Sequence, residues 1–223
     1  MYMDIECAQP IAIRNGVSGR LVRCRQCPPC LRASQRYWAA AAAHQIRQAH
    51  ETGCRSWMGT CTFKPEHRSA FEMKAAETCR TQQRRWESLD ATSRFDLLRC
   101  EALAEVQRYW KRLRKRGPAL KYLAVFEPDQ AAWPHMHCFV HELDPGRQIL
   151  KRELDAAWGL GFTNFSMLAP AADGSVPFGA ISYVTKAIAR HPQGRVCASA
   201  DYVPERRLPK MGRPHQQRLL FVR

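Results

Sequence analysis

Two histidines stand one residue apart in a short apolar run, as His135-Met136-His137 within HMHCFVH. If this run forms a strand, side chains at positions i and i+2 point to the same face, so one metal ion can be held by both imidazoles. Glu127 ends the preceding run KYLAVFE, and a hairpin of the two runs would bring its carboxylate to the same place. Two histidines and one acid leave coordination positions open for a substrate. The alternative is that these three are ordinary polar residues at exposed strand positions.

A tyrosine and a lysine, Tyr183 and Lys186, lie three residues apart in the segment ISYVTKAIAR. On a helix, positions i and i+3 share a face. A tyrosine hydroxyl is a weak nucleophile at neutral pH unless a nearby cation or a metal-polarised target assists it. Lys186 can supply that cation, or it can bind a DNA backbone. The alternative for Tyr183 is a half-buried aromatic residue on an amphipathic helix.

Three cysteines, Cys24, Cys27 and Cys30, follow a C-x2-C-x2-C spacing, and Cys7 precedes them. This spacing is typical of zinc ligands, and four thiolates complete a tetrahedral structural site. We expect such a site to tie the N-terminus to the first helix. The alternative is a group of reduced thiols without a metal. The remaining cysteines are scattered, and we expect them to be small buried side chains.

The elements that position these residues can be predicted from helix formers, β-branched residues and turn residues. We expect an irregular segment over residues 1–30 and an antiparallel sheet with helices on one face, which is an α+β fold. Extended segments are predicted over 55–63, 121–127, 135–141 and 161–167. Helices are predicted over 31–50, 66–116 with a break near 90–93, 146–158 and 176–191.

The charge of the chain indicates a polyanionic partner. Lys and Arg number 35 against 20 Asp and Glu, a formal net charge of +15, and nucleic acid is the commonest polyanion that such an excess attracts. A basic run at the end of a predicted helix can line a groove for phosphates, or it can be a solvated helix end. The run contains Lys111, Arg112, Arg114, Lys115 and Arg116. Trp133, beside the histidines, can stack on an unpaired base or cover the sheet edge.

Composition disfavours several classes of protein. A hydrophobic content of 45% fits a globular protein. No stretch reaches the roughly 18 apolar residues that span a membrane, so we expect no membrane partner. The start MYMDIECAQP lacks the pattern of a signal peptide. We therefore expect a cytoplasmic protein whose ten cysteines are reduced or bind metal rather than form disulfides.

In their order along the chain, these motifs resemble the HUH endonuclease superfamily. The closer resemblance is to the replication initiation proteins of microviruses, which are small single-stranded DNA phages. The similar features are the cysteine cluster and helix in CRQCPPCLRASQRYW, the Thr-rich GTCTF, the basic WKRLRKRG, a strand ending in Glu before PHMH, the pair Trp158-Gly159, and YVTK. The resemblance extends from about residue 20 to about residue 190.

The resemblance implies a metal-dependent endonuclease and strand transferase that starts rolling-circle replication at an origin in single-stranded DNA. Glu127, His135 and His137 would hold Mg²⁺ or Mn²⁺ against the scissile phosphate. Tyr183 would attack phosphorus and remain linked to the 5′ end of the cut strand, and the freed 3′ hydroxyl would prime a host polymerase in the host cytoplasm. A second transesterification would rejoin the displaced strand. A host helicase is a further expected partner.

The resemblance also divides the chain into three parts. We expect a Cys-rich N-terminal segment and helix over residues 1–50, an HUH endonuclease core with a ferredoxin-like or RRM-like sheet over 51–193, and a basic C-terminal tail over 194–223.

One departure from the family pattern concerns the tyrosine helix. Many of these phage initiators carry two tyrosines four residues apart, whereas Gly179 and Ala187 stand at that spacing from Tyr183. We therefore expect a single-tyrosine enzyme. Two other functions stay open: a single-tyrosine transposase or plasmid initiator with the same chemistry, and a zinc-stabilised nucleic-acid-binding protein without catalysis.

Overall fold

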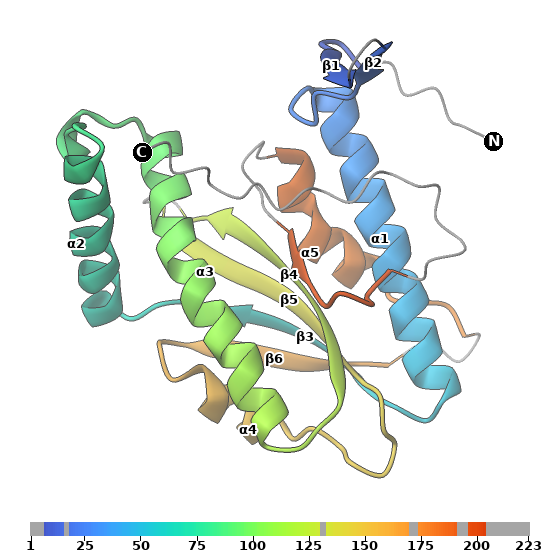
Figure 1. Ribbon diagram of the computed structural model, residues 1–223. Coiled ribbons are helices and arrows are strands. Elements are labelled where there is room, and N and C mark those ends of the chain that lie inside the picture. The colour runs from blue at the N-terminus through green and yellow to red at the C-terminus, as the bar shows by residue number, and fades with distance from the viewer. Residues whose placement is uncertain (1–6, 16–17, 130–132, 170–173, 191–195, 204–223) are drawn as a thin grey trace.

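The fold is α+β, with a five-stranded antiparallel sheet at its centre (Figure 1). A computed structural model describes residues 7–15, 18–129, 133–169, 174–190 and 196–203. The strand order in the sheet is β6-β3-β5-β4-β7. The strands are β3 (Ser56–Cys61), β4 (Leu120–Pro128), β5 (Pro134–Glu142), β6 (Thr163–Leu168) and β7 (Val196–Ala198). Strand β7 lies within the stretch expected as a basic tail, and it pairs with β4 at the edge of the sheet.

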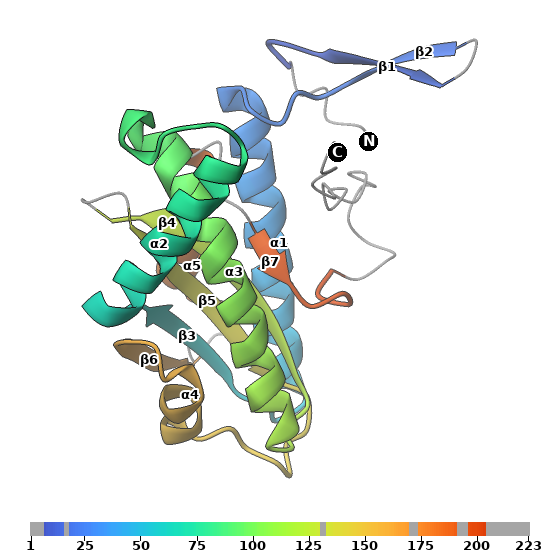
Figure 2. The ribbon, with the colours of Figure 1, turned by 60° about the vertical axis from the view of Figure 1, so that its left-hand side comes forward.

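Helices cover both faces of the sheet, so the expectation of helices on one face was wrong. The helices are α1 (Pro28–Glu51), α2 (Pro65–Thr81), α3 (Ala91–Lys115), α4 (Lys151–Trp158) and α5 (Phe178–Arg190). Helices α1 and α5 lie on one face, while α3, with α2 and α4 beside it, lies on the other (Figures 1 and 2). The physical reason is that β4 and β5 are apolar at nearly every position, and a strand buried on both faces needs cover on both.

Two hydrophobic clusters result from this arrangement. On one face of the sheet, Leu123, Val125 and Phe139 pack against α1 and α5. The alanines at 41–43 of α1 are buried in this cluster, and their small side chains allow α5 to approach closely. On the other face, Phe126 and its alternating neighbours pack against α3. Alternation along one strand therefore assigns every side chain of β4 to one helix layer or the other.

The β4–β5 hairpin predicted from the sequence is confirmed. Its register pairs Glu127 with His135 and Val125 with His137. On the other side of β5, strand β3 is antiparallel as well, and it pairs Thr60 with His137. The histidines thus lie on a central strand of the sheet rather than at an exposed edge.

The N-terminal segment departs from the expectation of irregular structure. Strands β1 (Ile11–Asn15) and β2 (Ser18–Val22) pair as a separate two-stranded antiparallel ribbon. The alternation IAI and the Gly at 16 and 19 are hairpin features that a short segment rich in cysteine and proline obscured. Helix α4 is also shorter than predicted, because it begins at Lys151. Asp90 ends the break between α2 and α3 by capping α3 through Ser93 N.

A buried polar network lies near the end of the sheet where β3 begins. His141 Nδ1 lies 2.8 Å from Ser56 Oγ, and His141 Nε2 lies 2.9 Å from the hydroxyl of Tyr202. Gln45 Nε2 of α1 donates to the Tyr202 carbonyl at 2.7 Å. Burial, with a smaller contribution from Lys121, lowers the pKa of His141 to about 3. The network joins the segment after β7 to both the sheet and α1.

The stability of the fold is expected to depend on this histidine. An unfolded histidine titrates near pH 6.5, so the folded chain binds fewer protons than the unfolded chain between pH 6.5 and about pH 3. The stability from His141 is present above pH 6.5 and is lost as the pH falls, by up to about 1.4 kcal/mol for each pH unit. Urea unfolding between pH 7.5 and pH 5 should show a shallower loss in His141→Asn than in the wild type. Equal slopes would contradict this role of His141.

Candidate active site

Three metal-ligating side chains converge where β4 ends and β5 begins. His137 Nε2 lies 3.0 Å from His135 Nε2 and 3.1 Å from Glu127 Oε2. His135 Nε2 and Glu127 Oε2 are 3.8 Å apart. All three side chains point to the sheet face that α5 covers, since they alternate with Phe126 and Met136 of the other cluster. Strand alternation and the hairpin register together make the group.

Burial sets the protonation of the two imidazoles. Desolvation is the main reason that the pKa of His137 falls to about 4, and the neighbouring His135 adds to the effect. Desolvation also lowers the pKa of His135, although the charge of Glu127 opposes it. Both rings are therefore neutral at pH 7, which is the form that binds a metal.

Thr60 of β3 fixes the ring of His137. Its Oγ1 lies 3.0 Å from His137 Nδ1, so the opposite nitrogen, Nε2, faces Glu127. Metal-binding histidines usually have such a partner on their second nitrogen, because the partner fixes the tautomer and the orientation of the ring. Thr60 is a functional residue that the sequence analysis did not assign, since nothing in the sequence gives the register between β3 and β5.

The donor set fits a small divalent cation. An octahedral ion with ligands at about 2.1 Å places neighbouring ligand atoms about 3.0 Å apart. Two of the three observed separations, 3.0 and 3.1 Å, have this value. Two nitrogens and one carboxylate oxygen also leave coordination positions for a substrate. Glu127, His135 and His137 can therefore hold a metal ion and present it to a ligand.

Helix α5 adds a hydroxyl and an ammonium group to the same place. The Tyr183 ring lies over His137, with 4.8 Å between ring centroids. Lys186 Nζ is 3.6 Å from Glu127 Oε2 and 4.3 Å from the centroid of the Tyr183 ring. The opposite side of the helix, which includes Ile181 and Val184, is buried in the cluster under α1. The amphipathic pattern of α5 therefore turns its polar face toward the metal-ligating group.

Tyr183 is the exposed tyrosine among those in the part of the chain that the structure describes. Its exposed fraction is 44%, whereas Tyr109, Tyr122 and Tyr202 are buried and Tyr37 is half-buried. Tyr202, the other tyrosine late in the chain, directs its hydroxyl into the His141 network. Tyr202 therefore has no access to a strand bound at the metal-ligating group.

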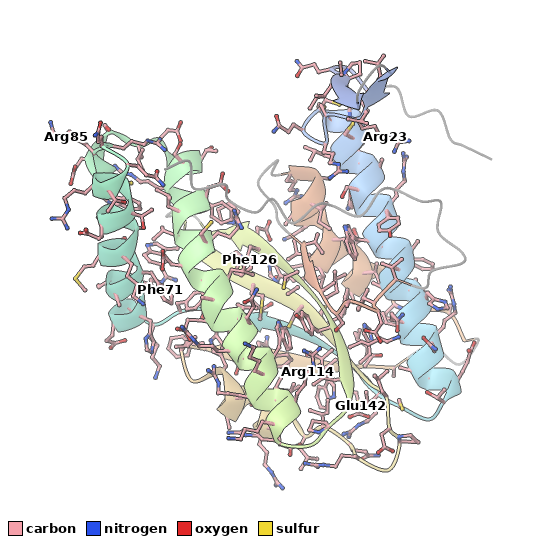
Figure 3. The ribbon with its side chains drawn as sticks, viewed as in Figure 1. Arg23, Phe71, Arg85, Arg114, Phe126 and Glu142 are labelled. Atoms are coloured by element: carbon pink, nitrogen blue, oxygen red, sulfur yellow. The ribbon has the colours of Figure 1, made fainter. Side chains whose placement is uncertain are left out.

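The basic run at the end of α3 lies away from this group. Helix α3 ends where β4 begins, whereas Glu127 stands near the end of β4, and Figure 3 shows Arg114 near Glu142 with Phe126 higher on the sheet. Arg112 donates to the carbonyls of Ala157 and Trp158 at the end of α4. Of the run, Lys111, Arg114, Lys115 and Arg116 are exposed. Arg114 also stacks on the Tyr122 ring.

Trp133 lies beside the histidines in the chain but faces the α3 side of the sheet. Its ring is buried within the cluster of that face, and the guanidinium of Arg68 covers it at 5.4 Å. Arg68 also forms an ion pair with Asp129 at 3.3 Å, and Asp129 accepts a hydrogen bond from Trp133 N. Of the two roles considered for Trp133, this geometry favours covering the sheet edge.

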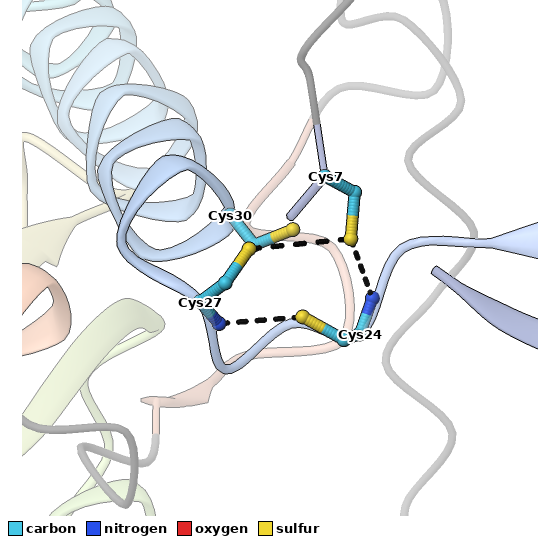
Figure 4. A group of neighbouring side chains, drawn as sticks. All are labelled: Cys7, Cys24, Cys27 and Cys30. Atoms are coloured by element: carbon cyan, nitrogen blue, oxygen red, sulfur yellow. Dashed lines mark hydrogen bonds between the residues drawn. The ribbon is translucent and has the colours of Figure 1, made fainter. Parts of the chain in front are cut away.

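The four N-terminal cysteines also converge (Figure 4). The Sγ atoms of Cys7, Cys24, Cys27 and Cys30 all lie within 4.8 Å of one another. The Sγ atoms of Cys7 and Cys27 are 4.0 Å apart. This group comes from the ribbon and from the first turn of α1, and it can hold a metal ion of its own.

Comparison with known proteins gives one family. The model of the family described as replication-associated protein ORF2 matches residues 56–191. That range contains β3 to β6, α5, and all of the residues in the converging group of Glu127, His135, His137, Tyr183 and Lys186. Curated proteins and solved structures gave no match. In the described part of the chain, no helix is long and apolar enough to cross a membrane.

Loss of the Thr60 hydroxyl should weaken metal binding without disturbing the fold. Thr60→Val keeps the shape of the side chain but removes the hydrogen bond to His137 Nδ1, so the affinity for Mn²⁺ should fall by about 10-fold to 100-fold. Thr60→Ser, which keeps the hydroxyl, is the matched control and should stay close to the wild type. Calorimetric titration with Mn²⁺ measures both. An unchanged affinity in Thr60→Val would show that the contact has no part in positioning His137.

Proposed function

Because the chain belongs to the replication-associated protein ORF2 family, a family of rolling-circle replication initiators, we propose that it nicks single-stranded DNA at a replication origin through a covalent 5′-phosphotyrosine. The proposed reaction is the HUH endonuclease type, and the proposed setting is the replication of a microvirus in the cytoplasm of its host. A single-tyrosine transposase or plasmid initiator would use the same residues on a different DNA.

The observation that carries this proposal is the meeting of two elements that are far apart in the sequence. The β4–β5 hairpin supplies Glu127, His135 and His137, and α5 supplies Tyr183 and Lys186 within contact distance of them. A purely structural metal site needs no exposed hydroxyl beside it. An accessible nucleophile beside a metal-ligating group with open positions is the arrangement that phosphoryl transfer requires.

The first step exchanges one phosphodiester for another. The Tyr183 oxygen attacks phosphorus at the scissile position, the bond from phosphorus to the 3′ oxygen breaks, and the 3′ oxygen leaves as a hydroxyl after it gains a proton. The tyrosine then carries the 5′ end of the strand. Because one ester replaces another, the energy of the broken bond is kept and no nucleotide cofactor is needed. The freed 3′ hydroxyl is a primer for a host polymerase, with a host helicase as a further partner.

Glu127, His135 and His137 would hold Mg²⁺ or Mn²⁺, whose bound charge would stabilise the negative charge that develops on the phosphate oxygens. The chain contributes the orientation of these ligands. Thr60 fixes the His137 ring, and burial keeps both imidazoles neutral. The carboxylate of Glu127 supplies the negative charge of the donor set.

Lys186 is proposed to act on the reacting groups rather than on distant DNA. Its ammonium group lies between Glu127 and the Tyr183 ring. From this place it can stabilise the phenolate as the hydroxyl loses its proton, or pair with a phosphate oxygen that approaches Tyr183. Its half-buried position strengthens both interactions relative to water.

Rejoining is proposed to use the same tyrosine. A Cβ at Gly179 would meet no atom within 4 Å, so the structure has space for a second side chain there, but the residue is glycine. Ala187, on the other side of Tyr183, is buried. A free 3′ hydroxyl would attack the phosphotyrosine, the strand would be rejoined, and Tyr183 would be released as a hydroxyl.

The covalent intermediate gives the direct test. The full chain would be mixed with the single-stranded origin region of its own genome and Mn²⁺, and separated on a denaturing gel. We expect a shifted protein band that needs the metal and disappears in Tyr183→Phe, because the substitution removes only the nucleophilic oxygen. Tyr37→Phe, at a half-buried tyrosine on α1, is the matched control and should keep the adduct.

Other results would change the conclusion in defined ways. An adduct that survives Tyr183→Phe would place the nucleophile elsewhere. Tight DNA binding without an adduct on any origin fragment would favour a binding protein without catalysis.

A second substitution separates the two roles open to Lys186. In Lys186→Met the rate of adduct formation at saturating DNA should fall by about 10²-fold, as for the loss of one group that stabilises developing charge, while the dissociation constant for DNA changes little. Lys74→Met, on the exposed face of α2, should leave both quantities unchanged. Single-turnover rates and fluorescence anisotropy measure them. A weaker affinity with an unchanged rate would make Lys186 a backbone-binding residue instead.

A further inference from the structure

The N-terminal ribbon and α1 carry a charge bias that the catalytic chemistry does not explain. From Cys7 to His50 the chain has no Asp or Glu. The same stretch contains Arg14, Arg20, Arg23, Arg25, Arg32, Arg36 and Arg47. The ribbon pairs with no strand of the main sheet, and Figure 2 shows it extending away from the helices. A two-stranded ribbon on its own is marginally stable in water, so something else has to hold it.

The cysteine cluster stands where that hold is needed. Cys7 precedes β1 and Cys24 follows β2, so these two cysteines are the feet of the ribbon. Cys27 is the N-cap residue of α1, and Cys30 lies in its first turn. Figure 4 shows the four side chains meeting at this junction. A single ion bound to all four would fasten both ends of the ribbon to the helix.

The backbone around the cluster is arranged for negatively charged sulfur. The N–H of Cys24 donates to Cys7 Sγ at 3.3 Å. The N–H groups of Gln26 and Cys27 donate to Cys24 Sγ at 3.4 and 3.3 Å. These bonds require a tight turn, in which Arg25 takes the left-handed conformation with φ of 62°, an uncommon one for a side chain of this size. A tetrahedral zinc ion with Zn–S bonds of about 2.3 Å needs sulfur atoms about 3.8 Å apart, and the observed separations need only a small contraction.

We propose that Cys7, Cys24, Cys27 and Cys30 bind one Zn²⁺ ion, and that this ion fixes the β1–β2 ribbon as an arm that binds the DNA backbone beside the nicking site. The identity of the ligand as DNA rests on the proposed function. The zinc site itself rests on the cluster alone.

The position of the arm supports this partner. Helix α1 ends at Glu51, close before β3 begins, and it passes back over the sheet toward the end that carries Glu127. With 24 residues it is about 36 Å long, whereas the six residues of β3 span about 20 Å. The N-terminal end of α1 therefore extends past the sheet at its catalytic end (Figure 1). A β-ribbon has the width that enters a major groove, and arginines bind phosphates.

Metal content tests the first half of the proposal. The purified full chain should contain one zinc ion, and Co²⁺ in its place should give the visible bands of a tetrahedral thiolate site. Cys24→Ser with Cys27→Ser should lose the ion, whereas Cys100→Ser, at an exposed cysteine on α3, should keep it. The double variant His135→Ala with His137→Ala should keep it as well, which separates this site from the catalytic one. A wild-type chain without zinc would overturn the proposal.

DNA binding tests the second half. The probes are a fluorescein-labelled 20-base-pair duplex and the matching single strand, titrated at several salt concentrations. Arg14→Gln with Arg20→Gln should reduce the salt slope for the duplex by about 1.8, or about 0.9 for each lost phosphate contact. The matched control is Arg84→Gln with Arg85→Gln, an exposed pair of which Figure 3 shows Arg85 on the far side of the molecule from Arg23. The cysteine double variant should lose duplex affinity too.

Three results decide between the alternatives. Equal weakening by the two arginine pairs would reduce the effect to net charge and overturn the arm. Loss of zinc with unchanged affinity for both probes would leave the ion a structural clasp only, and would also overturn the arm. A zinc-free variant that loses duplex affinity but still forms the Tyr183 adduct on a short single strand would support the arm independently of the nicking chemistry. Thermal unfolding of each variant checks that the sheet is intact.

Discussion

The pairing register of β4 with β5 is the constraint on which the rest of the site depends. Side chains alternate between the two faces of the sheet, so a slip of one residue would turn Glu127, His135 and His137 away from α5 and into the cluster under α3. The same slip would move Met136 to the polar site. Both faces are closely packed, and so the register is fixed by the whole core rather than by the short turn. The chemistry at one end of the hairpin is therefore maintained by packing along its full length.

Low polarity around the site determines how its charges behave. Two imidazoles that would titrate near neutral pH in water are held neutral, because burial penalises their charged forms. The carboxylate of Glu127 then has Lys186 as its cationic neighbour in the described structure. A bound cation would compete with that ammonium group for the carboxylate, so metal binding and the position of Lys186 are coupled. Tyr183 lies against both groups and is sensitive to each.

The parts of the fold that the sequence predicted are those determined by neighbouring residues. The run HMHCFVH and the run KYLAVFE are close in the chain, so the hairpin and the grouping of Glu127 with the histidines could be inferred from alternation alone. Helix α5 was predicted from its amphipathic pattern, but the contact of Tyr183 with His137 depends on packing across α1. Thr60 could not be found, because strands β3 and β5 are separated by two helices and by β4. Arg112 was assigned to DNA because the C-terminus of α4, which it caps, has no sequence signal directed at it.

The alanine-rich middle of α1 links events at its two ends. The helix supports α5, which carries Tyr183, and its first turn carries Cys27 and Cys30 at the base of the ribbon. A continuous helix transmits not only distance but also angle, since each residue adds about 1.5 Å of rise and about 100° of rotation. One residue inserted between the cysteines and the alanines would lengthen the molecule very little, yet it would swing the ribbon around to another side of the sheet. The length of α1 is thus a phase as much as a span, and it sets the direction from which a strand held by the ribbon would reach the tyrosine.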